Sequence, residues 1–159
     1  MNNISANNIG IANDHAAVEL KNIILASSLL QDYTWVDYGC HLEDGRVDYP
    51  DYASYVVKAL LKREIDVGIC LCGTGIGMSM TANRYGGIRA ACVWDIATAK
   101  ASRKHNDANI LCLGARLLDH KKVPLIVQTW LRTEFSHGRH KKRLAKLEDI
   151  TASAQSTSL

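Results

Sequence analysis

The chain has 159 residues, a formal net charge of +3 and 47% hydrophobic residues. This length allows one domain with a complete core, and this composition excludes an intrinsically disordered chain. No apolar stretch is long enough to cross a bilayer, and the small net charge predicts no general polyanion-binding surface, so we expect neither a membrane nor a nucleic acid as partner.

The N-terminus and the cysteines indicate the compartment in which the protein works. Residues 1–8 are polar and lack the basic and then apolar pattern of a signal peptide. The five cysteines are odd in number, and four of them lie in apolar, strand-like runs, namely Cys70, Cys72, Cys92 and Cys112. This usage predicts reduced thiols in a cytoplasmic protein rather than a disulfide framework.

Strand-like apolar runs alternate with helical patterns along the chain. Strands are predicted at residues 9–12, 34–38, 67–71, 88–94 and 109–114. Helices are predicted at residues 18–30, 48–61, 78–84, 95–104, 123–131 and 139–150, and residues 1–7 and 151–159 are expected to fray. The alternation predicts a single α/β domain over residues 1–159, with a parallel sheet covered by helices on both faces.

The third predicted strand ends in a glycine-rich turn, Cys72-Gly73-Thr74-Gly75-Ile76-Gly77, which leads into a helix. Glycines at alternate positions let the backbone turn sharply and bring its N–H groups close to a ligand. The start of the helix adds unpaired N–H donors and the positive end of a helix dipole, which suit a negative charge. Because such glycine patterns are weak evidence alone, a plain strand-to-helix turn with a packed cysteine stays open here.

Other polar residues follow the ends of predicted strands. In a parallel sheet, ligands bind at the carboxyl ends of the strands, and this rule brings four groups of residues to one edge. These are Asp14-His15, the glycine-rich turn, Asp95 and Arg116. His105 and Asn106 precede the fifth strand, so we expect them at the opposite edge. They reach the first edge only through the shape of the preceding loop or from another chain.

Seven motifs occur in a fixed order between about residue 8 and residue 150. They are Asn13-Asp14-His15, Asp48-Tyr49-Pro50-Asp51-Tyr52-Ala53, the glycine-rich turn with Ala82-Asn83, Gly87-Ile88-Arg89-Ala90, His105-Asn106-Asp107-Ala108-Asn109, Gly114-Ala115-Arg116 and Gly138-Arg139-His140. Together they resemble the type B ribose-5-phosphate isomerase family, which includes the subunits of galactose-6-phosphate isomerase. The resemblance implies a Rossmann-like three-layer α/β/α sandwich with a five-stranded parallel sheet. It also implies the interconversion of ribose 5-phosphate and ribulose 5-phosphate through an enediolate, in the non-oxidative pentose phosphate pathway, with neither a metal nor an organic cofactor.

The resemblance also implies roles for the residues of the glycine-rich turn. Cys72 would be the base that moves a proton between adjacent carbons. One branch of the family has a glutamate base at the position of Met78, which cannot take a proton. Thr74 would take part in ring opening or contact a substrate hydroxyl, with ordinary turn chemistry as the alternative. The enediolate oxygen and the substrate would be held by the remaining residues of the turn, Gly73, Gly75, Ile76 and Gly77.

By the same resemblance, residues outside the turn would bind the sugar and open its ring. His105 would be the acid–base group that opens the furanose, a role that suits histidine. Asn106 would hydrogen-bond the sugar hydroxyls, and Asp14 and His15 would hold hydroxyls or the ring oxygen. A solvent-exposed loop histidine and a simple helix start are the alternatives for His105 and for Asp14-His15.

Three arginines complete the predicted site. Arg139 and Arg143 are four residues apart and share one helix face, and guanidinium groups match phosphate oxygens. Arg116 would close over the substrate. In the family the site lies between two subunits, which implies a homodimer with shared active sites, alone or paired into a tetramer.

Three other interpretations stay open. One is a hexose 6-phosphate isomerase acting on allose or galactose phosphates, which would differ from a ribose-5-phosphate isomerase in the size of its pocket. Another is a non-catalytic nucleotide- or phosphate-binding module, although the segment after the first strand lacks the glycines of a dinucleotide site. A metal site of Cys70, Cys72 and His105 is the last, and its cysteine spacing is unlike that of zinc sites.

Overall fold

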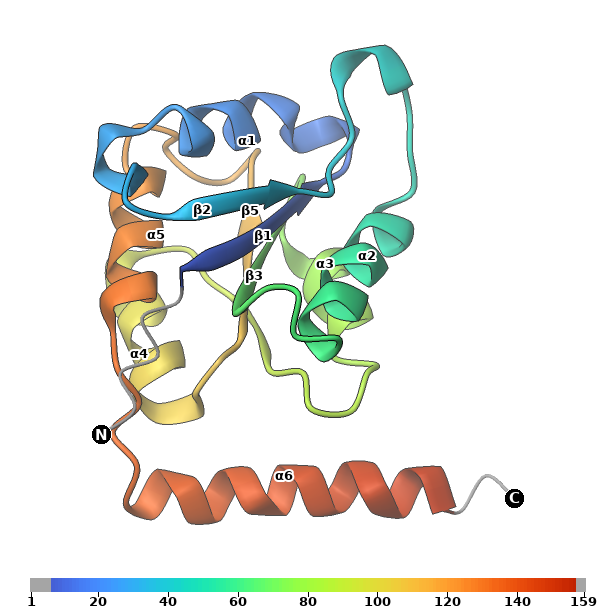
Figure 1. The fold of residues 1–159 in the computed structure, drawn as a ribbon, viewed down its shortest axis with the longest axis vertical. Coiled ribbons are helices and arrows are strands. Elements are labelled where there is room, and N and C mark those ends of the chain that lie inside the picture. Colours follow the sequence, from blue (N-terminus) through green and yellow to red (C-terminus); the bar gives the residue numbers. More distant parts are fainter. Residues whose placement is uncertain (1–6, 157–159) are drawn as a thin grey trace.

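A single five-stranded parallel sheet forms the centre of the molecule, as predicted. The computed structural model describes residues 7–156. The strands lie in the order β2-β1-β3-β5-β4 and every pair is parallel (Figure 1). They are β1 (Asn8–Asn13), β2 (Thr34–Asp37), β3 (Val67–Cys72), β4 (Ala90–Cys92) and β5 (Ile110–Gly114). Because β1 and β3 lie side by side at the centre, their carboxyl ends bring Asp14 and the glycine-rich turn together.

Helices cover both faces of the sheet, and Figure 1 shows them as two separate layers. They are α1 (Val18–Leu25), α2 (Tyr49–Leu61), α3 (Ile76–Ala82), α4 (Ile96–Asn106) and α5 (Val123–Arg132). One core packs α1, α4 and α5 against side chains such as Ile69 and Leu111, and the other packs α2 and α3 against Cys70 and Ile110. Since successive strand residues face opposite layers, β3 and β5 are buried along their whole length.

The helix starts follow local chemistry that the sequence displays. Pro50 lies in the first turn of α2, where its missing N–H leaves no hydrogen bond unmade. Asp95 caps α4, because its carboxylate accepts the N–H of Thr98 at 2.6 Å. In the part of the chain that the structure describes, no helix is long and apolar enough to cross a membrane.

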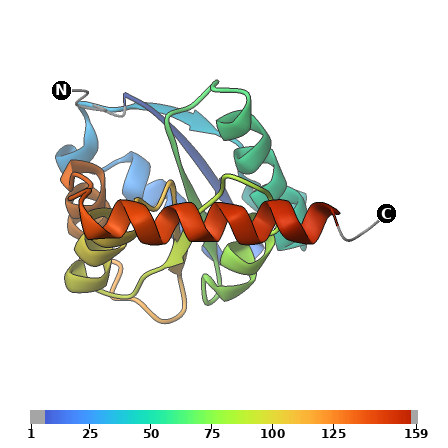
Figure 2. The same ribbon diagram turned by 90° about the horizontal axis from the view of Figure 1, so that it is seen from below.

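Helix α6 (Arg139–Ser156) lies outside the sandwich. It runs beneath the two layers and ends away from them, as the views from the front and from below both show (Figures 1 and 2). It continues six residues past its predicted end at Ile150. An ion pair between Glu148 Oε1 and Arg89 Nη1, 3.3 Å apart, joins it to the sheet layer. Residues 1–6 and 157–159, which belong to the ends predicted to fray, lie outside the range that the structure describes.

Several predicted boundaries are wrong, including the end of the first helix, which stops at Leu25 rather than at residue 30. The fourth strand is shorter than residues 88–94 and spans only Ala90–Cys92. Helix α4 continues past residue 104, so His105 and Asn106 belong to its last turn and not to a loop. The helix stops only at Asp107, which adopts a left-handed conformation with φ +45° and donates its N–H to Arg103 O at 3.1 Å.

Candidate active site

The glycine-rich turn holds the sulfur of Cys72 against the backbone of Gly75. The Gly75 N–H donates to Cys72 Sγ over 3.1 Å. Gly75 has φ +79°, which side-chain-bearing residues rarely adopt, and it forms the N-cap of α3. Cys72 is only 4% exposed. A backbone hydrogen-bond donor thus points at the sulfur from within the turn.

Strand β5 and the residues after it fix the far side of the turn. Ala115 N–H donates to Cys72 O at 2.9 Å, and Arg116 N–H donates to Gly73 O at 3.0 Å. The Arg116 side chain lies over Gly73, since a Cβ atom there would come within 3.3 Å of Arg116 Nη1. A Cβ on Gly114 would come within 2.6 Å of the Thr74 backbone. Glycine at these positions lets a cation and a neighbouring strand approach the turn closely.

Asp14 lies beside this turn, at the end of β1. Its carboxylate Oδ1 accepts the Ala16 N–H at 2.9 Å, and the residue is only 6% exposed. Burial raises the pKa of the Asp14 carboxyl, while the Ala16 hydrogen bond and the positive charges of His15 and Arg116 counteract part of that rise. His15 Nδ1 lies 3.1 Å from Val47 O, so the imidazole is tied to the loop before α2. The structure therefore brings Asp14, His15 and Arg116 together with the turn.

The other turn residues have distinct environments. Thr74 is exposed and its Oγ1 accepts the Ile76 N–H at 3.3 Å, which is ordinary turn chemistry. The ring of Tyr49 packs against Gly77, where a Cβ would come within 2.8 Å of Tyr49 Cε2. Within residues 7–156, the backbone N–H groups of Gly73 and Gly77 donate to no other group, whereas that of Gly75 is used by the sulfur. Two of the three predicted oxyanion donors are thus unengaged.

The remaining predicted residues form a second group at the opposite edge of the sheet. His105 and Asn106 end α4 just before β5 begins, and Arg139 and Arg143 lie on the first turns of α6. All four side chains are exposed. A strand rises about 3.3 Å per residue, so β3 alone separates the two edges by roughly 17 Å. Within one chain the structure does not bring His105, Asn106, Arg139 or Arg143 to Cys72.

A stacked pair of histidines connects the parts of this second group. The rings of His105 and His140 have centroids 4.6 Å apart and planes inclined by 16°. Burial lowers the pKa of His140, and the neighbouring His105, Arg139, Arg143 and Lys104 lower it further through their positive charge. A group with this many cations fits a strongly anionic ligand such as a phosphate.

The opposed edges also bear on the proposed metal site. Cys70 and Cys72 belong to β3, while His105 lies at the other edge, so the three cannot share an ion within one chain. Among the residues that the structure describes, no group of three or more His, Cys, Asp or Glu side chains is arranged to hold a metal.

Cys92 lies next to the turn, a position that its strand-like sequence context does not predict. Its thiol is 3.7 Å from Thr74 O, and a Cβ on Gly75 would come within 3.1 Å of Cys92 Sγ. Burial raises the pKa of the Cys92 thiol, and Cys72 raises it further. Its position follows from β4 lying next to β5, and no local sequence pattern encodes that order.

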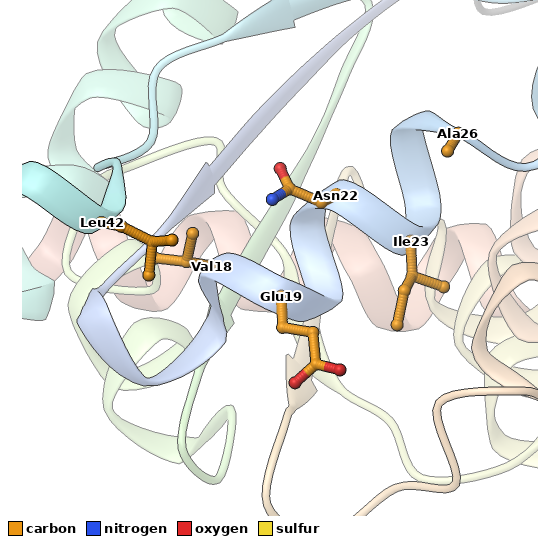
Figure 3. A pocket seen from close by; sticks show the side chains of 6 residues that line it. All are labelled: Val18, Glu19, Asn22, Ile23, Ala26 and Leu42. Carbon is orange, nitrogen blue, oxygen red and sulfur yellow. The ribbon is translucent and has the colours of Figure 1, made fainter.

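Two surface hollows lie along helices of the layer that contains α1, α4 and α5. One, of about 400 Å³, lies along the outer side of α1, where Val18 and Leu42 point toward one another (Figure 3). Its lining is Val18, Glu19, Asn22, Ile23, Ala26 and Leu42. The other, of about 570 Å³, lies between α4 and α5. Neither contains any of the predicted site residues.

The comparisons with known proteins agree with this arrangement. Residues 9–147 match the family described as Ribose/Galactose Isomerase. Ribose-5-phosphate isomerase B of Escherichia coli is 39% identical over 142 residues, which cover 89% of this chain and 93% of that one. The structure of the Clostridium thermocellum ribose-5-phosphate isomerase B superposes with a TM-score of 0.88 at 42% identity, over 92% of this chain and 99% of that one.

A third relative was solved with a sugar phosphate. It is ribose-5-phosphate isomerase B from Mycoplasma genitalium with bound ribulose 5-phosphate, with a TM-score of 0.84 and 38% identity. The superposition covers 90% of this chain and 95% of that one. The sheet order, the glycine-rich turn and these matches lead to one conclusion: this chain belongs to the ribose/galactose isomerase family.

Proposed function

We propose that the protein interconverts D-ribose 5-phosphate and D-ribulose 5-phosphate, with Cys72 as the base. The observation that carries the proposal is the Gly75 N–H pointing at Cys72 Sγ from 3.1 Å. This donor stabilises the thiolate that must take a proton from the sugar carbon. The amides of Gly73 and Gly77 remain for the oxygen that becomes negative in the enediolate. One such donor is typically worth about 2.7–4 kcal/mol of barrier.

The sugar would lie between the turn and the residues after β1. Asp14 and His15 would bind its hydroxyls or ring oxygen, and Arg116, already over Gly73, would close on it. Relatives named ribose-5-phosphate isomerase B, one of them with ribulose 5-phosphate bound, support the pentose assignment. Conversion of a pentose phosphate in this way belongs to the non-oxidative pentose phosphate pathway, and the five free cysteines support a cytoplasmic location.

A second copy of the chain would supply His105, Asn106, Arg139 and Arg143. One chain holds these residues at the wrong edge for its own Cys72, so a complete site requires a partner. Large apolar side chains are exposed around the glycine-rich edge: Ile76 is 54% exposed, Trp94 64% and Leu117 69%. On α6, Leu147 and Ile150 are 50% and 66% exposed. Such surfaces fit a homodimer interface.

The test uses the purified protein with ribose 5-phosphate in D₂O. Formation of ribulose 5-phosphate is followed together with the incorporation of solvent deuterium at C2 of recovered ribose 5-phosphate, and allose 6-phosphate and galactose 6-phosphate are run in parallel. We expect turnover and exchange with the pentose. Turnover of a hexose phosphate alone would identify the protein as a hexose phosphate isomerase instead. Binding of a sugar phosphate without any exchange would identify it as a non-catalytic phosphate-binding module.

A further inference from the structure

A lysine is buried behind the proposed active site. Lys21 of α1 is only 1% exposed, yet lysine is among the residue types that are almost never fully buried without a partner. Its ammonium lies 2.9 Å from Asp37 Oδ2 and 3.2 Å from Asp37 Oδ1, and it donates to Cys40 O at 2.9 Å. The buried charge is therefore paired with a carboxylate, and the ammonium donates two hydrogen bonds, one to Asp37 Oδ1 and one to Cys40 O.

The carbonyl of Cys40 connects this lysine to Asn13. Asn13 Nδ2 donates to Cys40 O at 3.2 Å and to Asp14 O at 2.9 Å, and it lies 3.3 Å from Cys40 Sγ. Both lone pairs of the Cys40 carbonyl are therefore occupied, one by Lys21 and one by Asn13. Asn13 directly precedes Asp14 in the chain, so the network ends at a residue of the proposed site.

The segment between Asp37 and Cys40 is shaped to close against Asn13. Gly39 N–H donates to Asp37 Oδ1 at 2.8 Å, and Cys40 N–H donates to Asn13 O at 3.3 Å. A Cβ on Gly39 would collide with Asn13 Oδ1, so only glycine allows this approach. Lys21, by holding both Asp37 and Cys40, joins the two ends of this segment.

The composition of the network is unfavourable for stability alone. A buried ion pair is often no more stabilising than apolar residues of the same shape. Asn13 Oδ1 is buried and has no hydrogen-bond partner within residues 7–156, so it adds the desolvation cost of an unsatisfied acceptor. What the network does provide is a fixed position for Asp14, whose N–H donates to Leu71 O at 3.0 Å and whose carboxylate accepts from Ala16.

We propose that Lys21 is a positioning residue, which clamps the Asp37–Cys40 segment against Asn13 and thereby holds Asp14 in register with the glycine-rich turn. This inference rests on the proposed function, because it concerns how Asp14 meets the sugar. Misplacement of a substrate-orienting group by about 1 Å can cost on the order of 100-fold in rate. The lysine thus acts on the reaction without touching the substrate.

The test is Lys21→Met, which keeps the length of the side chain and removes the ammonium. The Asp37 side chain is 30% exposed, so its carboxylate can be rehydrated in the variant. Lys62→Met is the control, because among the described residues Lys62 pairs only with Glu64, at 4.0 Å, and its side chain is 69% exposed. We expect the kcat on ribose 5-phosphate to fall by about 10- to 100-fold in Lys21→Met, with KM within about threefold, and no change in Lys62→Met.

Hydrogen–deuterium exchange provides a readout that needs no substrate. In Lys21→Met, the amides of Asp14, Ala16 and Ala17 should exchange faster, while those of α5 keep the wild-type rate. Unchanged exchange with unchanged kcat would overturn the proposal, and so would faster exchange throughout the chain, which a merely stabilising pair predicts. If the wild-type protein turns over no sugar phosphate, the proposed function fails. The exchange pattern alone then tests whether Lys21 holds the Asp37–Cys40 segment against Asn13. Should Lys21→Met not fold, Lys21→Met with Asp37→Asn removes the unpaired carboxylate, and failure of both to fold would also overturn the proposal.

Discussion

The imidazole of His105 stacks on that of His140, with ring centroids 4.6 Å apart, and so joins the end of α4 to the first turn of α6. The contact gathers the group proposed to open the ring and the arginines proposed to bind phosphate into one cluster. That cluster lies at the amino edge of the sheet, whereas Cys72 lies at the carboxyl edge. Under the proposed function, one chain therefore carries two halves of a site at opposite ends. Two chains related by a two-fold axis would complete two sites, each with one half from each chain.

The shared site predicts complementation between two inactive variants. Cys72→Ala and His105→Ala should each be inactive alone. After unfolding and refolding together, random pairing makes half of the dimers mixed, and each mixed dimer has one intact site, so about one quarter of the wild-type activity should return. Isomerase activity of the mixture measures this directly. Activity no greater than the sum of the separate variants would place the whole site in one chain.

Removal of the Cys72 thiol should abolish isomerisation and leave the fold intact. A positioned general base contributes about 10²–10⁴-fold in rate, so kcat of Cys72→Ala should fall by at least about 100-fold. Sugar-phosphate binding, followed by calorimetry, should persist. The matched control is Cys70→Ala, a buried residue two positions earlier in β3, which should retain turnover. Near-normal turnover of Cys72→Ala would remove this residue from the role of base.

Loss of Arg139 should weaken substrate binding without changing the chemical step. A phosphate contact is present in both the ground state and the transition state, so its removal raises KM and leaves kcat nearly unchanged. With a charged hydrogen bond worth about 1.5–3 kcal/mol, Arg139→Ala should raise KM by roughly 10- to 100-fold. Lys141→Ala, two positions later on the exposed helix, is the control and should behave as wild type. An unchanged KM in Arg139→Ala would move the phosphate contact elsewhere.

The parts of the fold that follow from local patterns could be predicted from the sequence. The continuous apolar run Val67–Cys72 indicates a central parallel strand, and the glycines after it indicate a turn that approaches its neighbours closely. The alternation of strands and helices predicts a parallel sheet, and this in turn predicts that Asp14, the turn and Arg116 lie at its carboxyl edge.

Long-range contacts could not be predicted in this way. Lys21 is charged and looks like a surface residue on a helix, yet Asp37 and Cys40, 16 and 19 residues away, hold it in the interior. Cys92 reaches the turn only because β5 lies between β3 and β4. The extension of α4 through His105 depends on the left-handed conformation of Asp107, which few side-chain-bearing residues adopt.

His140 should make the stability of the protein depend on pH. Burial and the neighbouring cations lower its pKa in the folded chain, whereas the unfolded chain has the ordinary value of 6.5. Between these two values the unfolded chain binds more protons, so stability falls as pH falls through that window. The thermal midpoint should therefore drop from pH 7.5 to pH 5.5 more in the wild type than in His140→Gln. His140→Arg, which is charged at both pH values, should be less stable than His140→Gln at each, and equal pH slopes in wild type and His140→Gln would contradict the prediction.

Crowding at Gly75 can be separated from the cost of its backbone conformation. Gly75 and Gly87 both have φ +79°, but a Cβ on Gly75 would meet Leu113 C at 3.0 Å and Cys92 Sγ at 3.1 Å, while one on Gly87 would meet only Leu61 Cδ2 at 3.9 Å. Gly87→Ala should therefore lower the free energy of unfolding by about 1–2 kcal/mol, the cost of a left-handed backbone for alanine. Gly75→Ala should lower it by about 1–3 kcal/mol more, because the added methyl group is also overpacked.

Denaturant unfolding measures both free energies, and isomerase assays add a second distinction. Because the Gly75 N–H donates to Cys72 Sγ, displacement of the turn in Gly75→Ala should also lower kcat by at least about tenfold, whereas Gly87→Ala should keep the wild-type kcat. Equal losses of stability in the two variants would show that the turn accommodates a methyl group. A wild-type kcat in Gly75→Ala would show that the amide and the sulfur need not be held together for proton transfer.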